Sequence, residues 1–359
     1  MAVPKLAIIL GAGASHDVCP HSSMWKERIT YQRQIGTKIR NVSRGRWQPP
    51  LVEDMFSGGE FDEVLAAHPE AASVMSTIRN EIAGNPRISF EESLQHRLDS
   101  RDGNLRHQIG FVPIALQEFF HKASTLYTSQ PFNYSDLVNR TVCAGICTAF
   151  ITVNYDTLLD QALTNSLREQ PQFKSVQCYV SSENWLLMKA HGSVDWGYPW
   201  PEAFQHNDML PAAREFELPK ADTGSIAVGL GPFRMRREVM HYPAMALPAS
   251  GKSTYGFVCP PSHEEAVKSF LEDCGNFLVI GFGARDQDVL NLLAEKVSKV
   301  RLLVIVIPSE HQPEVVQNLY AVPQFRAKLA SLLDSHLYPS FTEFVKTGLD
   351  PLQARILTA

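Results

Sequence analysis

The sequence has no long apolar run and no recognisable targeting segment. Its densest apolar runs, LAIIL at 6–10 and LLVIVI at 302–307, are far shorter than the roughly 18 residues that a membrane helix needs. Both have the length of buried strands. The N-terminus also lacks the basic, apolar and small-residue segments of a signal peptide. We therefore expect a cytoplasmic protein that does not bind a membrane.

The sequence also lacks the basic excess that is typical of nucleic-acid-binding proteins. Lys plus Arg number 33 and Asp plus Glu 38, which leaves a formal charge of −5 over 359 residues. We therefore expect no direct contact with nucleic acid. Hydrophobic residues at 44% and charged residues at 20% are normal for a folded chain. The length indicates either two domains or one large domain with an insertion.

The six cysteines show no zinc-binding pattern. None of them forms a CxxC pair, and Cys143 and Cys147, the two that come nearest to one, have no second pair to complete a tetrahedron of ligands. We expect buried, reduced thiols and no metal.

The spacing of apolar residues predicts an open α/β sheet that a helical insertion interrupts. Residues 22–148 show amphipathic helical stretches and no strong strand, and 195–260 are expected to form a long irregular region with one hairpin. Strands are expected at 5–10, 149–153, 177–180, 186–190, 277–280 and 302–307, and helices at 156–167, 263–274 and 286–298.

The first segment with a chemical signature is the glycine turn at 11–15, Gly11-Ala12-Gly13-Ala14-Ser15. Glycines let the backbone turn sharply after a strand and approach a pyrophosphate closely. The pattern departs from GxGxxG at His16, and no acid follows a strand end about twenty residues later. An ordinary hydride-transfer dinucleotide site is therefore disfavoured. Taken alone, the turn indicates either nucleotide binding or a structural strand–helix connection.

Three further segments place polar groups or glycines directly after predicted strands. Asn154 offers an amide donor and acceptor to a ribose hydroxyl or a water, whereas Asp156, taken alone, is typical of a helix N-cap. His191 brings an imidazole to a strand end, where a lone histidine is more often structural than catalytic. Gly281-Phe282-Gly283 forms a second glycine turn, with Asp286 as the cap of the next helix. Because open α/β sheets bind ligands at the carboxyl ends of their strands, the four segments point to one site.

In this order the four segments resemble the Sir2 (sirtuin) superfamily. GAGAS is similar to the family's GAG-x-S turn, TVNYD to its T-Q-N-x-D strand end and KAHGS to its L-H-G-S segment, while VIGFG stands where the family has a later glycine-rich ribose loop. The resemblance implies a Rossmann-like NAD domain at 1–21 and 149–359, split by a helical insertion at 22–148. It implies Asn154 and His191 as catalytic residues. The NAD-binding residues that it implies are Gly11, Ala12, Gly13, Ala14, Ser15, Asp156, Ser193, Gly281, Phe282 and Gly283.

The departures from the family are equally informative. Where family deacylases continue into G-I-P-D-F-R, this chain reads HDVCPH at 16–21. The two CxxC pairs of the deacylases' zinc module and their F-G-E segment are also missing. A long insertion without a zinc module resembles the Sir2-like domains of bacterial anti-phage systems, which hydrolyse NAD and deplete the infected cell.

The resemblance therefore implies an NAD hydrolase that needs no metal. The turn at 11–15 would hold the pyrophosphate, Asn154 would position the nicotinamide ribose or the attacking water, and His191 would accept a proton, which suits an imidazole. Asp156 would bind ribose or orient the carboxamide. Two alternatives stay open: an NAD-dependent protein deacylase, and a non-catalytic module that senses NAD or ADP-ribose.

An NADase of this kind has to be held inactive until it is needed. The resemblance thus implies a homo-oligomer, or a separate partner such as a HerA-type ATPase or a short Argonaute. Two acidic segments of the insertion, Phe61-Asp62-Glu63 and Phe90-Glu91-Glu92, lie either near the site or at solvated helix starts. An apolar C-terminal stripe either forms an interface or packs on the chain's own core: Leu319, Tyr320, Phe325, Leu329, Leu332 and Leu333.

Overall fold

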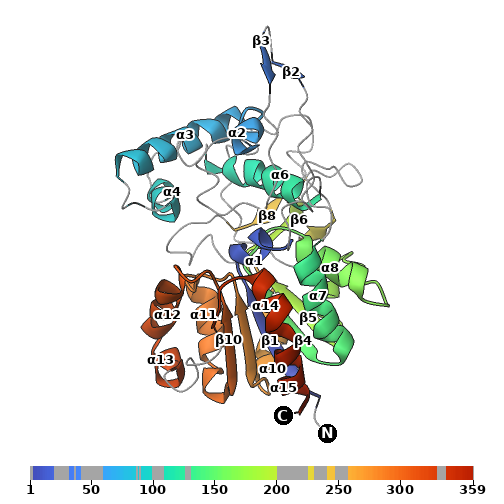
Figure 1. Ribbon diagram of the computed structural model, residues 1–359. Coiled ribbons are helices and arrows are strands. Elements are labelled where there is room, and N and C mark those ends of the chain that lie inside the picture. The colour runs from blue at the N-terminus through green and yellow to red at the C-terminus, as the bar shows by residue number, and fades with distance from the viewer. Residues whose placement is uncertain are drawn as a thin grey trace.

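The structure is a computed structural model of the chain. It describes residues 3–19, 32–35, 38–41, 60–85, 88, 90–98, 109–125, 131–199, 225–229, 241–246, 258–329 and 337–358. A six-stranded parallel sheet lies at the centre of these residues, with helices on both sides of it (Figure 1).

The strand order of the large sheet is that of a Rossmann-like fold. In space the order is β11-β10-β9-β1-β4-β5, and every neighbouring pair is parallel. The chain runs from the central β1 outward through β4 and β5, then returns to build β9, β10 and β11 on the other side, which is the doubly wound order 3-2-1-4-5-6. The predicted α/β class and Rossmann-like sheet are confirmed. The strands are β1 (Lys5–Leu10), β4 (Cys147–Thr152), β5 (Trp185–Lys189), β9 (Asn276–Ile280), β10 (Leu302–Val306) and β11 (Leu337–Tyr338).

Burial on both faces of the sheet explains the unbroken apolar runs of its strands. In β1, Leu6, Ile8 and Leu10 belong to one hydrophobic cluster, and Ala7 and Ile9 to another. Successive residues of a strand point to opposite faces, so a strand covered on both sides needs apolar residues throughout. The helices on the Leu6 face are α7 (Phe132–Arg140), α8 (Leu158–Ser166), α14 (Phe341–Thr347) and α15 (Leu349–Thr358). Those on the Ala7 face are α10 (Pro261–Leu271), α11 (Gln287–Ala294), α12 (Gln312–Ala321) and α13 (Pro323–Leu329).

A second group of elements, which we name the cap layer, lies beyond the carboxyl ends of the central strands (Figure 1). Its helix α6 packs on a small antiparallel sheet: Gln117 Nε2 donates to Val194 O at 2.9 Å, and Tyr242 OH donates to Gly110 O at 2.7 Å. The cap layer therefore stands over the sheet edge where ligands of such folds bind. Its elements are α2 (Glu60–Leu65), α3 (Pro69–Gly84), α4 (Phe90–Leu98), α6 (Val112–Thr125), β6 (Gly192–Pro199), β7 (Ala227–Val228) and β8 (His241–Met245).

Two local predictions were wrong. The expected strand at 177–180 is a 3₁₀ helix, η4 (Val176–Tyr179), in which Tyr179 alone is buried, so this segment has one anchor and no apolar face for a sheet. The stretch expected to be helical contains an antiparallel hairpin, β2 (Gln32–Ile35) with β3 (Lys38–Asn41), whose polar residues gave no strand signal.

The cysteine prediction holds only in part. Cys19, Cys259 and Cys274 are buried free thiols, whereas Cys143 is exposed. Cys143 lies in the 3₁₀ helix η3 (Val142–Ala144), just before β4, where the chain turns at the surface.

The division of the chain at 22–148 stays a prediction. Within that range α7 packs on α8 and α14, the helices that cover the large sheet.

None of the helices that the structure describes combines the length and apolar character required to cross a membrane.

In the C-terminal stripe, Leu319, Phe325 and Leu329 are buried against the sheet, so these three pack on the chain's own core, while Leu332 and Leu333 lie outside the described residues.

Candidate functional site

The four segments singled out in the sequence follow four adjacent strands. The strands β9, β1, β4 and β5 are neighbours, and Leu10 at the end of β1 pairs with Thr152 of β4 and Ile280 of β9. Thr152 in turn pairs with Lys189 at the end of β5. The strands therefore end level, and the residues that follow them gather at one edge. This edge includes the point beside β1 where the strand order reverses, which is the usual ligand position in open α/β sheets.

The two glycine turns pack directly on each other. Gly11 N donates to Ile280 O at 3.1 Å, and Gly13 N donates to Gly281 O at 3.2 Å. A Cβ on Gly11 would lie 2.4 Å from Gly281 O, so no other residue fits there. Gly281 has a φ of +58°, and a Cβ on it would lie 2.2 Å from Ala14 N. Close backbone packing therefore accounts for these glycines independently of any ligand.

This packing also limits which amides of the first turn can meet a phosphate. The amide of Gly13 is bound to Gly281, and that of Ala14 donates to Gly11 O at 2.9 Å. Ala12 is exposed at the start of α1 (Ala12–His16), a helix of five residues. A nucleotide at this turn would thus approach at Ala12.

Asn154 joins the end of β4 to the first turn. Its Nδ2 donates to Gly11 O at 2.9 Å and to Ser15 Oγ at 3.0 Å. Because both N–H bonds of the amide are used, its oxygen is the atom that can meet a ligand, as an acceptor. A further hydrogen bond of 2.9 Å links Ser15 Oγ to the hydroxyl of Tyr134 on α7. Burial raises the pKa of Tyr134 above its ordinary value, so the phenol stays neutral.

Asp156 lies where helix α8 begins and has a structural task there. The N-cap of α8 is Thr157 and not Asp156, but Asp156 Oδ1 accepts a hydrogen bond from Leu158 N at 3.0 Å just before the helix. Burial raises its pKa, and a hydrogen bond from Ser15 opposes that effect. A contact of Asp156 with NAD stays a prediction.

His191, which follows β5, is paired with a carboxylate from the loop after β9, three strands away in the same sheet. Its Nε2 lies 2.5 Å from Asp286 Oδ2, and both side chains are buried. The other oxygen of Asp286 accepts from Val289 N at 2.9 Å and caps α11, so the cap expected from the sequence is present. The ring of Tyr155 stands 6.1 Å from the imidazole, centroid to centroid. The imidazole is therefore held in place before any ligand binds.

A buried charged cluster lies under the strand ends, at Lys189. The Lys189 ammonium, which is fully buried, donates to Asp156 O at 2.6 Å and to Ser193 Oγ at 2.9 Å, and it lies 2.9 Å from Asp160 Oδ2. Burial raises the pKa of Asp195, and the positive charge of Lys189 acts in the opposite direction. Ser193 is itself fully buried and bound to this lysine, so a contact of Ser193 with NAD stays a prediction.

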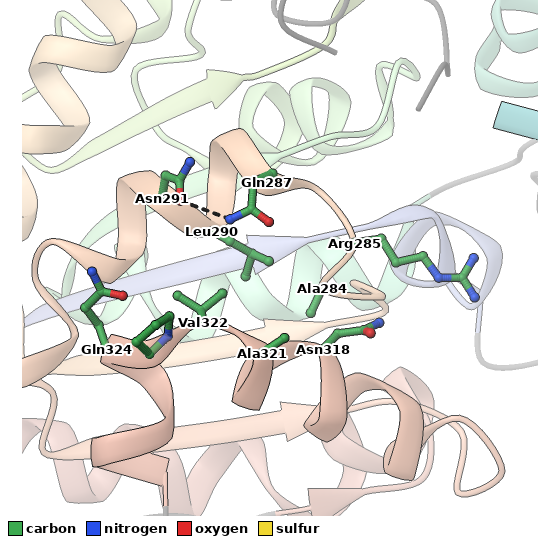
Figure 2. Close-up of a pocket in the computed structure, with 10 residues that line it drawn as sticks. Ala284, Arg285, Gln287, Leu290, Asn291, Asn318, Ala321, Val322 and Gln324 are labelled. Carbon is green, nitrogen blue, oxygen red and sulfur yellow. Dashed lines mark hydrogen bonds between the residues drawn. The ribbon is translucent and has the colours of Figure 1, made fainter. Parts of the chain in front are cut away.

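A cavity of about 550 Å³ lies beside the second glycine turn, between α11 and α12 (Figure 2). The Gln287 amide donates to Asn291 Oδ1 at 3.0 Å along one wall, and Asn318 Nδ2 donates to Gly283 O at 2.9 Å. None of the site residues expected from the sequence lines this cavity. Its walls are Ala284, Arg285, Gln287, Leu290, Asn291, Asn318, Ala321, Val322, Pro323 and Gln324.

The first of the two acidic segments has partners within the cap layer. Asp62 pairs with Arg79 of α3, and the rings of Phe61 and Phe119 pack at 4.9 Å. The side chain of Glu91 lies outside the described residues. Among the described residues, no group of three or more His, Cys, Asp and Glu side chains is placed to hold a metal ion.

A comparison with known protein families finds a match over part of the chain. Residues 148–315 match the SIR2-like domain. The matched segment begins in β4 and ends in α12, so it contains Asn154, His191 and the second glycine turn, while the first turn lies outside it. The resemblance stated from the sequence is confirmed at this level. No curated protein matches the chain.

Solved structures of Sir2 homologues are also similar to the chain. A Sir2 homologue in complex with NAD is 14% identical, with a TM-score of 0.40, over 99% of this chain and 90% of that chain. Two mutant Sir2 homologues in complexes with ADP-ribose are each 14% identical over 99% of this chain and 92% of theirs, with TM-scores of 0.42 and 0.43.

Sequence reasoning missed three groups that support the site: Tyr134 behind Ser15, Asp286 behind His191, and the cluster around Lys189. Each pairs residues from separate elements, and His191 and Asp286 are 95 positions apart. A local pattern carries no signal for such a pairing. Only Asp286 had a signal of its own, as the residue that caps a helix.

Proposed function

We propose that this protein hydrolyses the bond between nicotinamide and ribose in NAD and releases nicotinamide and ADP-ribose. The observation that carries the proposal is the position of Asn154 and His191 just after the paired ends of the adjacent strands β4 and β5, at the same sheet edge as two interlocked glycine turns. A SIR2-like domain around both residues supports NAD as the ligand.

The chemistry needs a base and an acceptor more than it needs an acid. Nicotinamide leaves as a neutral base from a cationic ring, so the difficulty lies in stabilising an oxocarbenium-like ribose and delivering water to it. The Asn154 oxygen accepts a hydrogen bond from a ribose hydroxyl or from the water. His191 accepts the proton that the water loses as its oxygen bonds to the ribose carbon.

The remaining contacts follow from the layout of the edge. The pyrophosphate lies at Ala12 in the turn at 11–15, and the second turn, Gly281 to Gly283, faces the other ribose. Asp156, which follows β4, binds ribose or orients the carboxamide, and Ser193 at the start of β6 lies behind it, linked to it through Lys189. The protein does this without a metal.

Hydrolysis is favoured over deacylation because the sequence lacks the motifs of the deacylases. The whole chain has neither the CxxC pairs nor the F-G-E segment of the deacylases. The cap layer lies beyond the carboxyl ends of the central strands, on the side where the two glycine turns lie (Figure 1). We place the activity in anti-phage defence, under the control of a homo-oligomer or of a partner such as a HerA-type ATPase or a short Argonaute.

The decisive experiment incubates the purified protein with NAD, alone and with an acetyl-lysine peptide. Free ADP-ribose without the peptide is the expected result, and it should disappear in His191→Ala and Asn154→Ala. The exposed His96 and Asn165 provide matched controls, since His96→Ala and Asn165→Ala should keep the wild-type rate. Turnover only with the peptide would show a deacylase, and binding without turnover would show a sensor. Repeating the assay with the products of neighbouring genes tests the regulation.

A further inference from the structure

The hydrogen bond between His191 and Asp286 determines which nitrogen of the imidazole carries the proton. The Nε2 atom of His191 is the one that faces Asp286 Oδ2. An ionised carboxylate only accepts, so the hydrogen atom in this bond belongs to Nε2. A neutral imidazole with its proton on Nε2 has its lone pair on Nδ1.

We propose that Asp286 is the positioning residue of the site: it holds His191 in the Nε2–H tautomer, so that Nδ1 is the base that takes the proton from water. The tautomer follows from the pairing alone. Its catalytic consequence rests on the proposed NAD hydrolysis.

The second contact of Asp286 supports its ionised form. Its Oδ1 accepts from Val289 N at the start of α11, where unpaired amides and the helix dipole stabilise negative charge. Both oxygens of the carboxylate are therefore used as acceptors, one by a helix and one by the imidazole.

The loop that carries Asp286 is held rigidly. Ala284 has a φ of +53°, a conformation that a residue with a Cβ rarely adopts, and it is 2% exposed. Asn318 on α12 ties down the carbonyl of Gly283, and Gly281 packs on the first turn. Local strain of this kind persists where the surroundings over-determine the backbone, and it is common at functional sites. The carboxylate is thus placed before the substrate arrives.

The imidazole is restrained from its other sides as well. The carbonyl of His191 accepts from Ala246 N at 2.9 Å, and the hydroxyl of Tyr155 donates to Ala246 O at 2.8 Å. With Tyr155 beside the ring, these contacts restrain His191 in addition to its pair with Asp286.

The proton balance of the reaction uses both nitrogens. As the water oxygen bonds to the ribose carbon, its proton moves to Nδ1 and the bond to nicotinamide breaks. The imidazolium then formed keeps its Nε2 proton and is paired with the Asp286 carboxylate, which does not itself become protonated. The proton on Nδ1 later passes to solvent.

A first test reads the tautomer without any substrate. Nitrogen-15 NMR of the histidine-labelled protein, with the His191 signals assigned by their loss in His191→Gln, should show a protonated Nε2 and an unprotonated Nδ1. In Asp286→Asn, which can still cap α11, the asparagine amide can donate to Nε2, and the proton should move to Nδ1. A protonated Nδ1 in the wild type, or an unchanged spectrum in the variant, would overturn the assignment.

A second test separates positioning from mere stability. Asp286→Asn should lower kcat by about 10²- to 10⁴-fold and leave KM within about threefold. Adding Asp286→Asn to His191→Ala should cost nothing further, because the aspartate acts through the imidazole. Independent, multiplying losses would contradict positioning. Ser340→Ala removes the cap of α14 and should leave kcat unchanged. If the wild type consumes no NAD, the proposed function fails, while the NMR result still decides the tautomer.

Discussion

The side-chain amide of Asn154 donates a hydrogen bond of 2.9 Å to the carbonyl oxygen of Gly11, 143 residues earlier in the chain. This bond and its companion to Ser15 fix the end of β4 to the turn after β1. Asn154→Asp removes the donor and places a negative charge against a carbonyl oxygen. We expect NAD turnover to fall by at least about 10²-fold and the free energy of unfolding to fall by about 1–3 kcal/mol.

Steady-state kinetics and denaturant unfolding measure the two effects of Asn154→Asp. Asn165→Asp, at an exposed position on α8, provides the control for a new charge and should change neither quantity appreciably. A variant at Asn154 with normal turnover would remove this side chain from the site.

The contact between the two glycine turns makes a separate prediction about Gly281. A Cβ there would meet Ala14 N at 2.2 Å, in addition to the strain of a φ of +58°. Gly145 has a φ of +86° but nothing within 4 Å of the added atom, so it isolates the strain alone. We expect Gly145→Ala to cost about 1–2 kcal/mol, and Gly281→Ala clearly more, because backbone has to move. Equal losses in thermal unfolding would show that the turns are not in close contact.

The cluster around Lys189 predicts a large loss of stability when the ammonium group of this lysine is removed. Lys189→Met leaves Asp160 buried without its partner at 2.9 Å, close to Asp195. Breaking a buried pair in this way costs about 3–5 kcal/mol. Lys268→Met, which removes an exposed pair with Glu264, should leave the unfolding midpoint unchanged. Comparable midpoints for the two variants would mean that water reaches the cluster.

The contrast between these residues shows what the sequence could predict. The strands β1, β9 and β10 were predicted because a strand covered on both faces is apolar throughout, and that pattern is local. The shared edge of Asn154 and His191 followed from the rule for parallel strands. The partners of these side chains did not, because Gly11 and Asp286 reach them only through the tertiary fold, as Tyr134 reaches Ser15. The hairpin β2–β3 was missed because its two strands, QRQI and KIRN, contain one apolar residue each and show no apolar alternation in the sequence.

Glu118 on α6 predicts an acid-dependent loss of stability in the cap layer. A hydrogen bond from His68 at 2.9 Å, assisted by Lys122, lowers the pKa of Glu118 to about 2. The unfolded chain therefore binds this proton more readily, and the stabilisation is present above a pH of about 4.5 and is lost as the pH falls toward 2. Since the carboxylate is partly exposed, we expect about 1–2 kcal/mol. Denaturant unfolding of Glu118→Gln between these pH values should show a flatter slope than the wild type, while Glu310→Gln, at an exposed position, should reproduce the wild-type slope. A wild-type slope in Glu118→Gln would place the acid sensitivity of the fold on other carboxylates.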